Sequence, residues 1–288
     1  MRSKLFVPGV RPELFAKALA GGADALSLDL EDSVPESRKQ EAREQVAAFV
    51  QSAAVRDSAK LMVVRVNAMD TPHLQADLAA VARSGVDLVN LPKVESAQQV
   101  LDAVSMLERA EAANGLTRPI GLLLTIETPR GLRQAAGIAA AHPRVAGLQV
   151  GLADLYEPCG IDRRDAANVH SILLAVRMAA AEAGVFACDA AFADIGDAAG
   201  FQAEAAMARR LGYLGKTCIH PAQVALANAA FLPDANEIAA ARRIVAAAGQ
   251  ADNAGRGAFL VDGRMVDLPF LKRAQALLAG VDSSPSQS

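Results

Sequence analysis

The chain contains no tryptophan and only two tyrosines among its 288 residues. Aromatic side chains this scarce cannot form a stacking platform for nucleic-acid bases. The net charge is −3, and no lysine- or arginine-rich run occurs that would attract a polyanion. Both absences argue against nucleic acid as the main partner.

Cysteine and long hydrophobic runs are also scarce. The three cysteines, Cys159, Cys188 and Cys218, form no C-x-x-C pair, so we expect three small buried side chains, not a disulfide framework or a zinc site. No apolar stretch approaches the ~18 residues of a membrane span. The apolar stretch near the N-terminus, Leu5 to Pro8, is too short for the core of a signal peptide. We therefore expect a cytoplasmic protein without a membrane partner.

Hydrophobic residues make up 52% of the chain, enough for one large core. Eight short runs that are apolar along their whole length alternate with longer, alanine-rich amphipathic stretches. Such runs, each followed by a helix, indicate a parallel sheet covered by helices, and eight units favour an α/β fold of the (β/α)8 or TIM-barrel class. No G-x-G-x-x-G or G-x-x-x-x-G-K-[ST] motif opens a helix, which argues against a nucleotide-binding open sheet. The predicted strands are Lys4–Pro8, Ala25–Leu30, Leu61–Asn67, Leu88–Lys93, Ile120–Glu127, Val145–Gly151, Val185–Ala190 and Gly215–His220.

The helical patterns fill the gaps between these strands and continue beyond the last one. We expect the barrel to occupy residues 1–232, followed by an extension over 233–282 that packs on the barrel or on a neighbouring subunit, and a disordered tail over 283–288. Within the extension, Asp262-Gly263 lies between two apolar runs and predicts a tight hairpin turn. The predicted helices are Pro12–Ala20, Glu36–Gln51, Thr71–Arg83, Ser96–Ala113, Pro129–Ala140, Asp165–Ala181, Asp197–Leu211, Pro221–Ala230, Asn236–Gly249 and Pro269–Leu278.

Polar residues at the carboxyl ends of barrel strands mark the active site of this fold class. Glu127 and Asp154 follow consecutive strands, so we expect their carboxylates to be neighbours. Two carboxylates without a nearby His or Cys set are typical of a hard-cation site, and Mg²⁺ would bind one oxygen of each (Mn²⁺ has similar preferences). The alternative is that each carboxylate pairs with an arginine.

Arg65 lies inside the apolar run VVRVN, where a lone buried charge would be costly. Its planar fork suits a carboxylate or a thioester oxygen, and a structural ion pair with Asp29 or Glu31 is compatible with that role. We expect the cluster Asp29, Glu31 and Asp32 to orient Arg65 and metal-bound water without contacting substrate.

Two further residues at strand ends can have either a catalytic or a structural role. Lys93 is either a Schiff-base lysine, as in metal-independent aldolases, or a charge at the rim. His220 precedes a proline and is more typical of a structural hydrogen bond than of a base.

The sequence resembles the citrate lyase beta-subunit-like proteins of the HpcH/HpaI aldolase superfamily, which include malyl-CoA and citramalyl-CoA lyases. The likeness runs in order from Arg2 to about Leu278. It rests on the motifs RSKLFVPGVRPELFAKAL, GADALSLDLEDSV, VVRVN, NLPKVES, IETPRG, GLADL, GKTCIHPAQV and GRMVDLPFLKRAQ.

The resemblance implies a Mg²⁺-dependent carbon–carbon lyase that cleaves a 3-hydroxyacyl-CoA thioester into acetyl-CoA and a 2-keto acid by retro-Claisen chemistry. It assigns Mg²⁺ to Glu127 and Asp154, with Glu127 also serving substrate binding and catalysis, and the acid part of the substrate to Arg65. In the family's lyases the residue that matches Asp267 comes from a neighbouring subunit and acts as an acid or base, with trimers as the usual assembly. The remaining substrate-binding residues that the resemblance suggests, mainly for coenzyme A, are Phe6, Arg11, Lys17, Ala153 and Pro221.

Other activities remain open at this point. The chain could be the beta subunit of a true citrate lyase, which cleaves citryl bound to an acyl-carrier protein, or a malate or citramalate synthase or thioesterase. A non-catalytic scaffold is disfavoured, because a scaffold has no need of Glu127, Asp154, Arg65 and Asp267 together.

Overall fold

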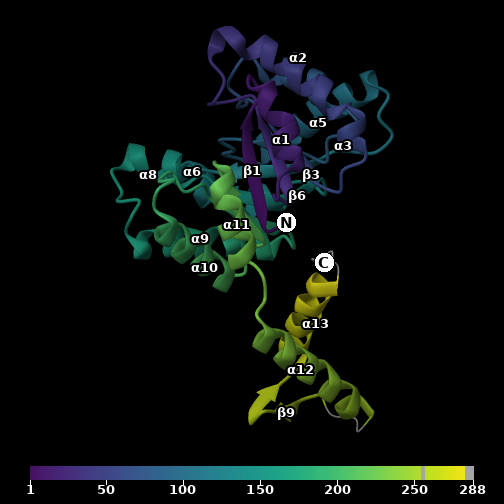
Figure 1. The fold of residues 1–288 in the computed structure, drawn as a ribbon, viewed down its shortest axis with the longest axis vertical. Helices are drawn as coiled ribbons and strands as arrows, with labels where there is room; N and C mark the ends of the chain where they lie inside the picture. Colours follow the sequence, from purple (N-terminus) through teal and green to yellow (C-terminus); the bar gives the residue numbers. More distant parts are fainter. Residues whose placement is uncertain (254–256, 283–288) are drawn as a thin grey trace. The chain divides into compact units, whose positions relative to one another are not determined.

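The computed structural model describes residues 1–253 and 257–282, and the chain divides into two compact units, Met1–Phe231 and the residues from Leu232 onward. In the first unit, eight parallel strands pair in chain order and β8 pairs with β1, which closes a barrel surrounded by helices (Figure 1). The predicted (β/α)8 fold is confirmed. The strands are β1 (Ser3–Pro8), β2 (Ala25–Asp29), β3 (Leu61–Arg65), β4 (Leu88–Leu91), β5 (Gly121–Ile126), β6 (Val145–Val150), β7 (Phe186–Asp189) and β8 (Gly215–Cys218).

Most strands are shorter than predicted at their carboxyl ends. Asn67 and Lys93, for example, follow β3 and β4 outside the strands, because the chain leaves the ladder before the apolar pattern ends. The helices of the barrel unit are α1 (Phe15–Ala20), α2 (Lys39–Val50), α3 (Ala53–Arg56), α4 (Leu74–Val81), α5 (Ala97–Ala113), α6 (Pro129–Arg133), α7 (Ala135–Ala139), α8 (Leu152–Tyr156), α9 (Ala166–Glu182), α10 (Ala198–Arg210) and α11 (Pro221–Ala230), with 3₁₀ helices at Pro12–Leu14, Glu36–Arg38 and Glu157–Cys159.

Four short helices differ from the sequence prediction. α3 and α8 were not predicted, and the expected helix Pro129–Ala140 is divided at Gln134 into α6 and α7. One cysteine prediction was wrong: Cys188 and Cys218 are buried, but Cys159 is exposed, because it lies in a 3₁₀ turn that covers no core.

The barrel interior changes character along its axis. Val63, Leu88 and Leu123 form a small apolar cluster inside, against which Phe186 packs. Because side chains on a strand alternate between the two faces, the inward residues two positions further on are Arg65, Asn90 and Thr125. The apolar cluster therefore closes the amino end of the barrel, and polar groups fill the carboxyl end.

The second unit consists of α12 (Ala235–Asn253), an antiparallel hairpin of β9 (Phe259–Val261) and β10 (Arg264–Val266), and α13 (Leu268–Asp282). Asp262 and Gly263 both have positive φ, 50° and 77°, as a two-residue hairpin turn of the I′ type requires, so the predicted hairpin is confirmed. The tail predicted over 283–288 lies outside the described residues. Among the described helices, none combines the length and apolarity needed to span a bilayer.

Candidate active site

Arg65, the last residue of β3, is held by three carboxylates from the end of β2. Its Nε and Nη2 donate to the two oxygens of Asp29 at 2.7 and 2.8 Å, a bidentate pair, and Asp29 is buried. Nη1 lies 2.9 Å from Glu31 and 3.3 Å from Asp32. Burial alone would lower the pKa of Arg65, but the hydrogen bonds and charges of these carboxylates outweigh it and raise the pKa. Arg65 is therefore a permanent cation with a fixed orientation.

Lys93 ties the end of β4 to two acidic residues. Its backbone has φ of 52°, in the left-handed region that non-glycine residues rarely adopt. In this conformation its amide donates to Glu127 Oε1 at 2.7 Å while its Nζ donates to Glu31 Oε1 at 2.8 Å. Burial opposes the charge, but Glu31 and Asp32 raise the pKa of Lys93 well above its usual value. A Schiff-base lysine needs a neutral amine, so this environment argues against that reading.

Glu127 follows β5 and is almost fully buried, with 3% of its surface exposed. Burial is the main cause that raises the pKa of its carboxyl to about 8, and the charges of Asp154 and Glu31 add to the effect. A Cβ on Gly151 would lie 2.3 Å from Glu127 Oε2. The glycine therefore leaves the space in which the carboxylate sits.

Asp154 lies in the first turn of α8, directly after β6, and is exposed. Neither Asp154 nor Glu127 forms an ion pair with a lysine or arginine in the described part of the chain, contrary to the alternative that each pairs with an arginine. Two adjacent carboxylates without a cationic partner suit a hard divalent cation. Within residues 1–253 and 257–282, no three His, Cys, Asp or Glu side chains gather into a metal site, so a cation here would complete its coordination with water or substrate oxygens.

The other predicted residues of the barrel unit lie around the same end. The half-buried Phe6 ring contacts Arg65, with 4.7 Å from its centroid to the guanidinium carbon. Ala153 is exposed beside Asp154, and Pro221 opens α11. Arg11 and Lys17 are exposed around α1, where Arg11 pairs with Glu13, and no contact joins either of them to the Arg65 cluster.

Asp267 belongs to the second unit, between β10 and α13. Its backbone carbonyl accepts from the amide of Leu271, and its Oδ1 atom is buried without a hydrogen-bond partner in the described chain. His220 caps α11 by accepting from the amide of Ala222 at 3.2 Å, which agrees with a structural role.

Two polar groups of the barrel were not predicted from sequence. Lys4, on β1, reaches across the interior to Gln149 on β6. On the outer side of the wall, Lys216 pairs with Asp189 and Glu204, which in turn binds Arg163. The signal for both was present, because in each case a lysine lies inside a short buried strand.

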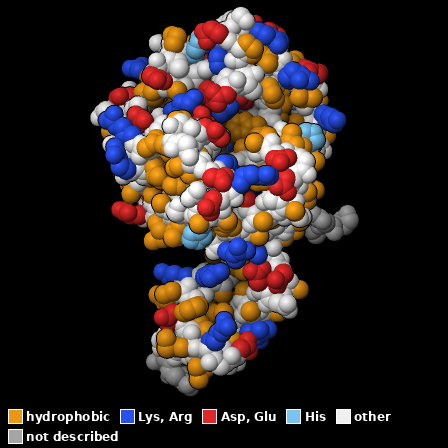
Figure 2. Space-filling view, turned by 90° about the vertical axis from the view of Figure 1, so that its left-hand side faces the viewer, with side chains coloured by type: hydrophobic (Ala, Val, Ile, Leu, Met, Phe, Trp, Pro, Cys, Tyr) orange, Lys and Arg blue, Asp and Glu red, His pale blue; other side chains and the backbone are white. Residues whose placement is uncertain are grey.

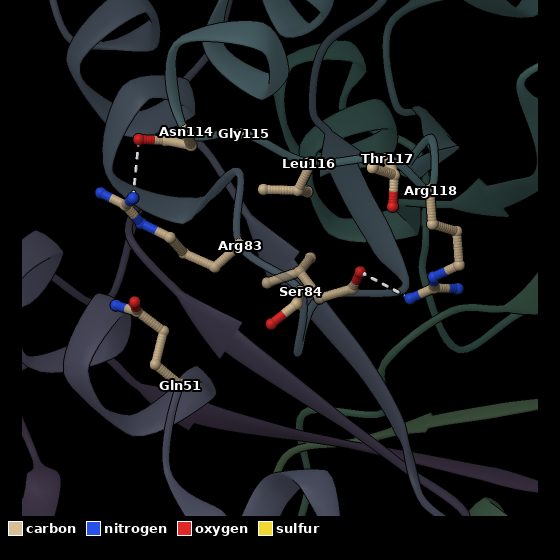
Figure 3. Close-up of a pocket in the computed structure, with 9 residues that line it drawn as sticks. Gln51, Arg83, Ser84, Asn114, Gly115, Leu116, Thr117 and Arg118 are labelled. Carbon is tan, nitrogen blue, oxygen red and sulfur yellow. Dashed lines mark hydrogen bonds between the residues drawn. The ribbon is translucent and has the colours of Figure 1, made fainter.

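A cavity of about 490 Å³ adjoins Glu31 and Lys93 at the carboxyl end of the barrel, lined by residues that follow β2, β3 and β4. A second pocket of about 290 Å³ lies at the opposite end, among loops that precede strands (Figure 3). There the guanidinium groups of Arg83 and Arg118 point to opposite sides and bind Asn114 and the carbonyl of Val86, respectively. The cavity at the carboxyl end shares Glu31, Asp32 and Lys93 with the candidate site, whereas the second pocket shares no residue with it.

Comparison with known proteins agrees with this geometry. Residues 2–221 match the family HpcH/HpaI aldolase/citrate lyase. The chain is 38% identical to citrate lyase subunit beta of Escherichia coli K12 over 98% of this chain and 94% of that protein. It is 34% identical to an L-malyl-CoA/beta-methylmalyl-CoA lyase of Cereibacter sphaeroides, over 96% and 93%.

A solved structure is similarly close. The crystal structure of CitE from Mycobacterium tuberculosis, in complex with magnesium, acetoacetate and coenzyme A, superimposes with a TM-score of 0.78 at 34% identity, over 98% of this chain and all of that one. These matches confirm the resemblance drawn from the strand-end motifs. The chain belongs to the HpcH/HpaI aldolase/citrate lyase family.

Proposed function

We propose that the protein is a Mg²⁺-dependent carbon–carbon lyase that cleaves a 3-hydroxyacyl-CoA thioester, of the citramalyl-CoA or malyl-CoA type, into acetyl-CoA and a 2-keto acid. The observation that carries the proposal is the pair Glu127 and Asp154, which lack a cationic partner in the described chain and lie at the same barrel end as the oriented cation Arg65. The malyl-CoA lyase relative and the magnesium and coenzyme A in the CitE complex support it.

Glu127 and Asp154 would hold the cation, with Mn²⁺ as an alternative to Mg²⁺. When bound, a divalent cation polarises carbonyl and carboxylate oxygens as a Lewis acid. The protein's own part is positional: the Lys93 amide fixes one oxygen of Glu127, and the space above Gly151 accepts the other.

Arg65 stabilises negative charge that develops on the substrate. A guanidinium has five N–H donors, and Asp29 takes two of them, from Nε and Nη2. The second Nη2 hydrogen is not needed by Asp29, so it can meet the acid end of the substrate or the oxygen of a thioester enolate. Because Asp29 already holds the guanidinium in place, little reorganisation is needed as that charge appears.

We propose that a base takes the proton of the substrate hydroxyl as the bond between C2 and C3 breaks, and that Asp267, from a neighbouring subunit, then supplies a proton to the enolate carbon. The second unit exposes large apolar side chains, which favour burial against a second copy of the chain. Hydrophobic groups are visible on its surface in Figure 2. A closed homo-oligomer, a trimer in our proposal, would bury them and share active sites between subunits. These side chains are Leu260, Met265, Leu268 and Phe270, each more than half exposed.

A second candidate function is that of the citrate lyase beta subunit, with citryl carried on an acyl-carrier protein. The 38% identity to the E. coli subunit favours it. The bond cleavage would be the same, so the site geometry does not separate the two functions.

The test is an assay of the purified protein with malyl-CoA, citramalyl-CoA and citryl-CoA, with Mg²⁺ and after treatment with EDTA. We expect the protein to cleave one of these thioesters. EDTA should abolish this activity, and added Mg²⁺ or Mn²⁺ should restore it. Full activity in EDTA would refute the metal site. No cleavage of any of the three, together with cleavage of citryl-acyl-carrier protein, would establish the second candidate.

The shared site is tested by mixing two inactive variants, Asp267→Asn and Glu127→Ala. Hybrid oligomers contain some sites with both residues intact, so part of the activity should return. If mass spectrometry shows that subunits exchange and no activity returns, Asp267 does not complete a neighbour's site.

A further inference from the structure

Lys4 is a wholly buried lysine inside the barrel. It stands on β1, and its Nζ donates to the side-chain carbonyl of Gln149 on β6. β1 pairs only with β2 and β8, so this contact crosses the interior. None of the chain's described carboxylates forms an ion pair with the ammonium, which is unusual for a lysine with no exposed surface.

The ammonium lies directly below the polar end of the barrel. It is 4.5 Å from the centroid of the Phe6 ring, and the guanidinium carbon of Arg65 is 4.7 Å from the same centroid. Phe6 is half-buried, whereas Lys4 is completely covered. The same ring therefore contacts a buried cation and the cation that we assign to the substrate.

The charges around the site explain what a third cation would do there. Five carboxylates face two cations at this end of the barrel, namely Asp29, Glu31, Asp32, Glu127 and Asp154 against Arg65 and Lys93. A 2-keto acid brings a further negative charge to this acidic environment. A cation beneath the ring offsets part of that repulsion without occupying substrate space.

We propose that Lys4 is a positioning residue of the active site: it holds the Phe6 ring beneath Arg65 and supplies positive charge that favours an anionic keto acid. This inference rests on the proposed function. A lysine kept in this environment is costly for stability, which is typical of groups retained for function.

The charge of Lys4 is sensitive to pH in an accessible range. Burial is the main cause that lowers the pKa of its ammonium to about 8, with nearby Arg65 acting in the same direction and Asp29 against it. The other titratable groups that face it keep their charge between pH 6.5 and 9. Asp29 has a lowered pKa, Arg65 a raised one, and the thiols of Cys188 and Cys218 have raised pKa values.

The experiment is a calorimetric titration of pyruvate, glyoxylate and oxaloacetate into the full-length protein at saturating Mg²⁺, from pH 6.5 to 9. In the wild type, whichever of these keto acids binds should lose about tenfold in affinity as the pH rises through 8. Lys4 loses its charge over this range, and removing one charge near a ligand in a partly buried site has an effect of this order. Lys4→Gln retains a donor for Gln149 without the charge. It should bind about tenfold more weakly at pH 7 and show no dependence on pH around 8.

Two controls separate charge from structure. Lys4→Arg remains charged over the whole range and should keep high affinity at pH 9. Lys216→Gln removes a buried lysine that faces away from the interior and should lower stability without changing the pH profile of binding.

The outcomes are distinct. If a keto acid binds wild type and Lys4→Gln equally at every pH, the inference is wrong and the proposed function stands. If no keto acid binds the wild type with Mg²⁺, both fall. Should Lys4→Gln fail to fold, the comparison of wild type with Lys4→Arg decides the matter, because the Glu127 carboxyl, whose pKa is also raised to about 8, contributes equally to both profiles. An equal fall in affinity in these two proteins would contradict the inference.

Discussion

Two clusters of buried charge in the barrel unit differ in their balance. The wall cluster lies on the outer side of the barrel, next to α10 and the loop before α9. It pairs two cations with two carboxylates at 2.6–2.7 Å, and its members are Lys216, Arg163, Asp189 and Glu204. The mouth cluster lies at the carboxyl end of the barrel and has five carboxylates for two cations: Asp29, Glu31, Asp32, Glu127, Asp154, Arg65 and Lys93.

The difference indicates what each cluster is for. In the wall cluster every charge has its partner within the chain, so the cluster is complete as folded and acts as a structural tie. In the mouth cluster Glu127 and Asp154 lack a cationic partner in the described chain, and burial raises the pKa of Glu127. A bound cation would supply the positive charge that the mouth cluster lacks. We therefore place the chemistry in the mouth cluster.

The largest expected effect is on the wall cluster. Lys216→Met removes the cation shared by Asp189 and Glu204 and leaves buried carboxylates without compensation, which costs about 3–5 kcal/mol of unfolding free energy. Urea denaturation of wild type and variant measures it. A loss below about 1 kcal/mol would show that the wall cluster is not a structural tie, since exposed pairs contribute that little.

The next effect concerns the mouth. Arg65→Lys keeps the charge but loses the planar fork that binds Asp29 through two donors. We expect kcat/KM to fall about thirty- to a thousandfold, equivalent to about 2–4 kcal/mol of transition-state stabilisation. A near-normal kcat/KM in this variant would show that Arg65 serves only as a structural ion-pair residue.

Lys4 and Lys216 should contribute to the pH dependence of the free energy of unfolding with opposite signs. The folded pKa of Lys4 is about 8, below its ordinary 10.5, so between these values the unfolded chain binds more protons and stability should rise with pH, by at most about 3 kcal/mol. The pKa of Lys216 is raised, because Asp189 and Glu204 outweigh burial, so its contribution is lost only above pH 10.5. Lys4→Gln should flatten the rise, as measured by denaturation at pH 7.5 to 10. A rise of equal size in the variant would contradict the assignment.

The smallest effect tests the placement of Glu127. Gly151→Ala adds a methyl group that would lie 2.3 Å from Glu127 Oε2, so the carboxylate must shift, at a cost of about 1–2 kcal/mol. Mg²⁺ affinity should fall with it. Gly137→Ala, on α7 with no atom within 4 Å of the added group, is the matched control and should leave the Mg²⁺ affinity unchanged. Equal Mg²⁺ affinities in the two variants would mean that Gly151 does not determine the position of Glu127.

The fold was predictable because the eight strands are covered on both faces and therefore read as short, wholly apolar runs. The position of Arg65, Glu127 and Asp154 followed from the rule that active sites form at the carboxyl ends of barrel strands. The ion pairs of Arg65 with Asp29 and Glu31 were anticipated as well, because neighbouring strands end side by side.

Other features depend on information that strand patterns lack. Lys4 and Lys216 both sit in apolar strands, but only the register shows that one points inward to Gln149 and the other outward to Glu204. The left-handed backbone of Lys93, which directs its amide to Glu127, has no signature in the motif NLPKVES. Asp189 ends β7 much as Glu127 follows β5, yet it pairs with Lys216 of β8 on the outer side of the wall.

The central claim, that the mouth cluster is completed by a divalent cation, is tested most directly by calorimetric titration of Mg²⁺ into metal-free protein at pH 7.5. Wild type and Glu127→Gln are compared, because the substitution keeps the size of the side chain and removes its charge. We predict one Mg²⁺ site per chain in the wild type and loss of that site in Glu127→Gln. Absence of binding to the wild type, or equal binding to both proteins, would contradict the account.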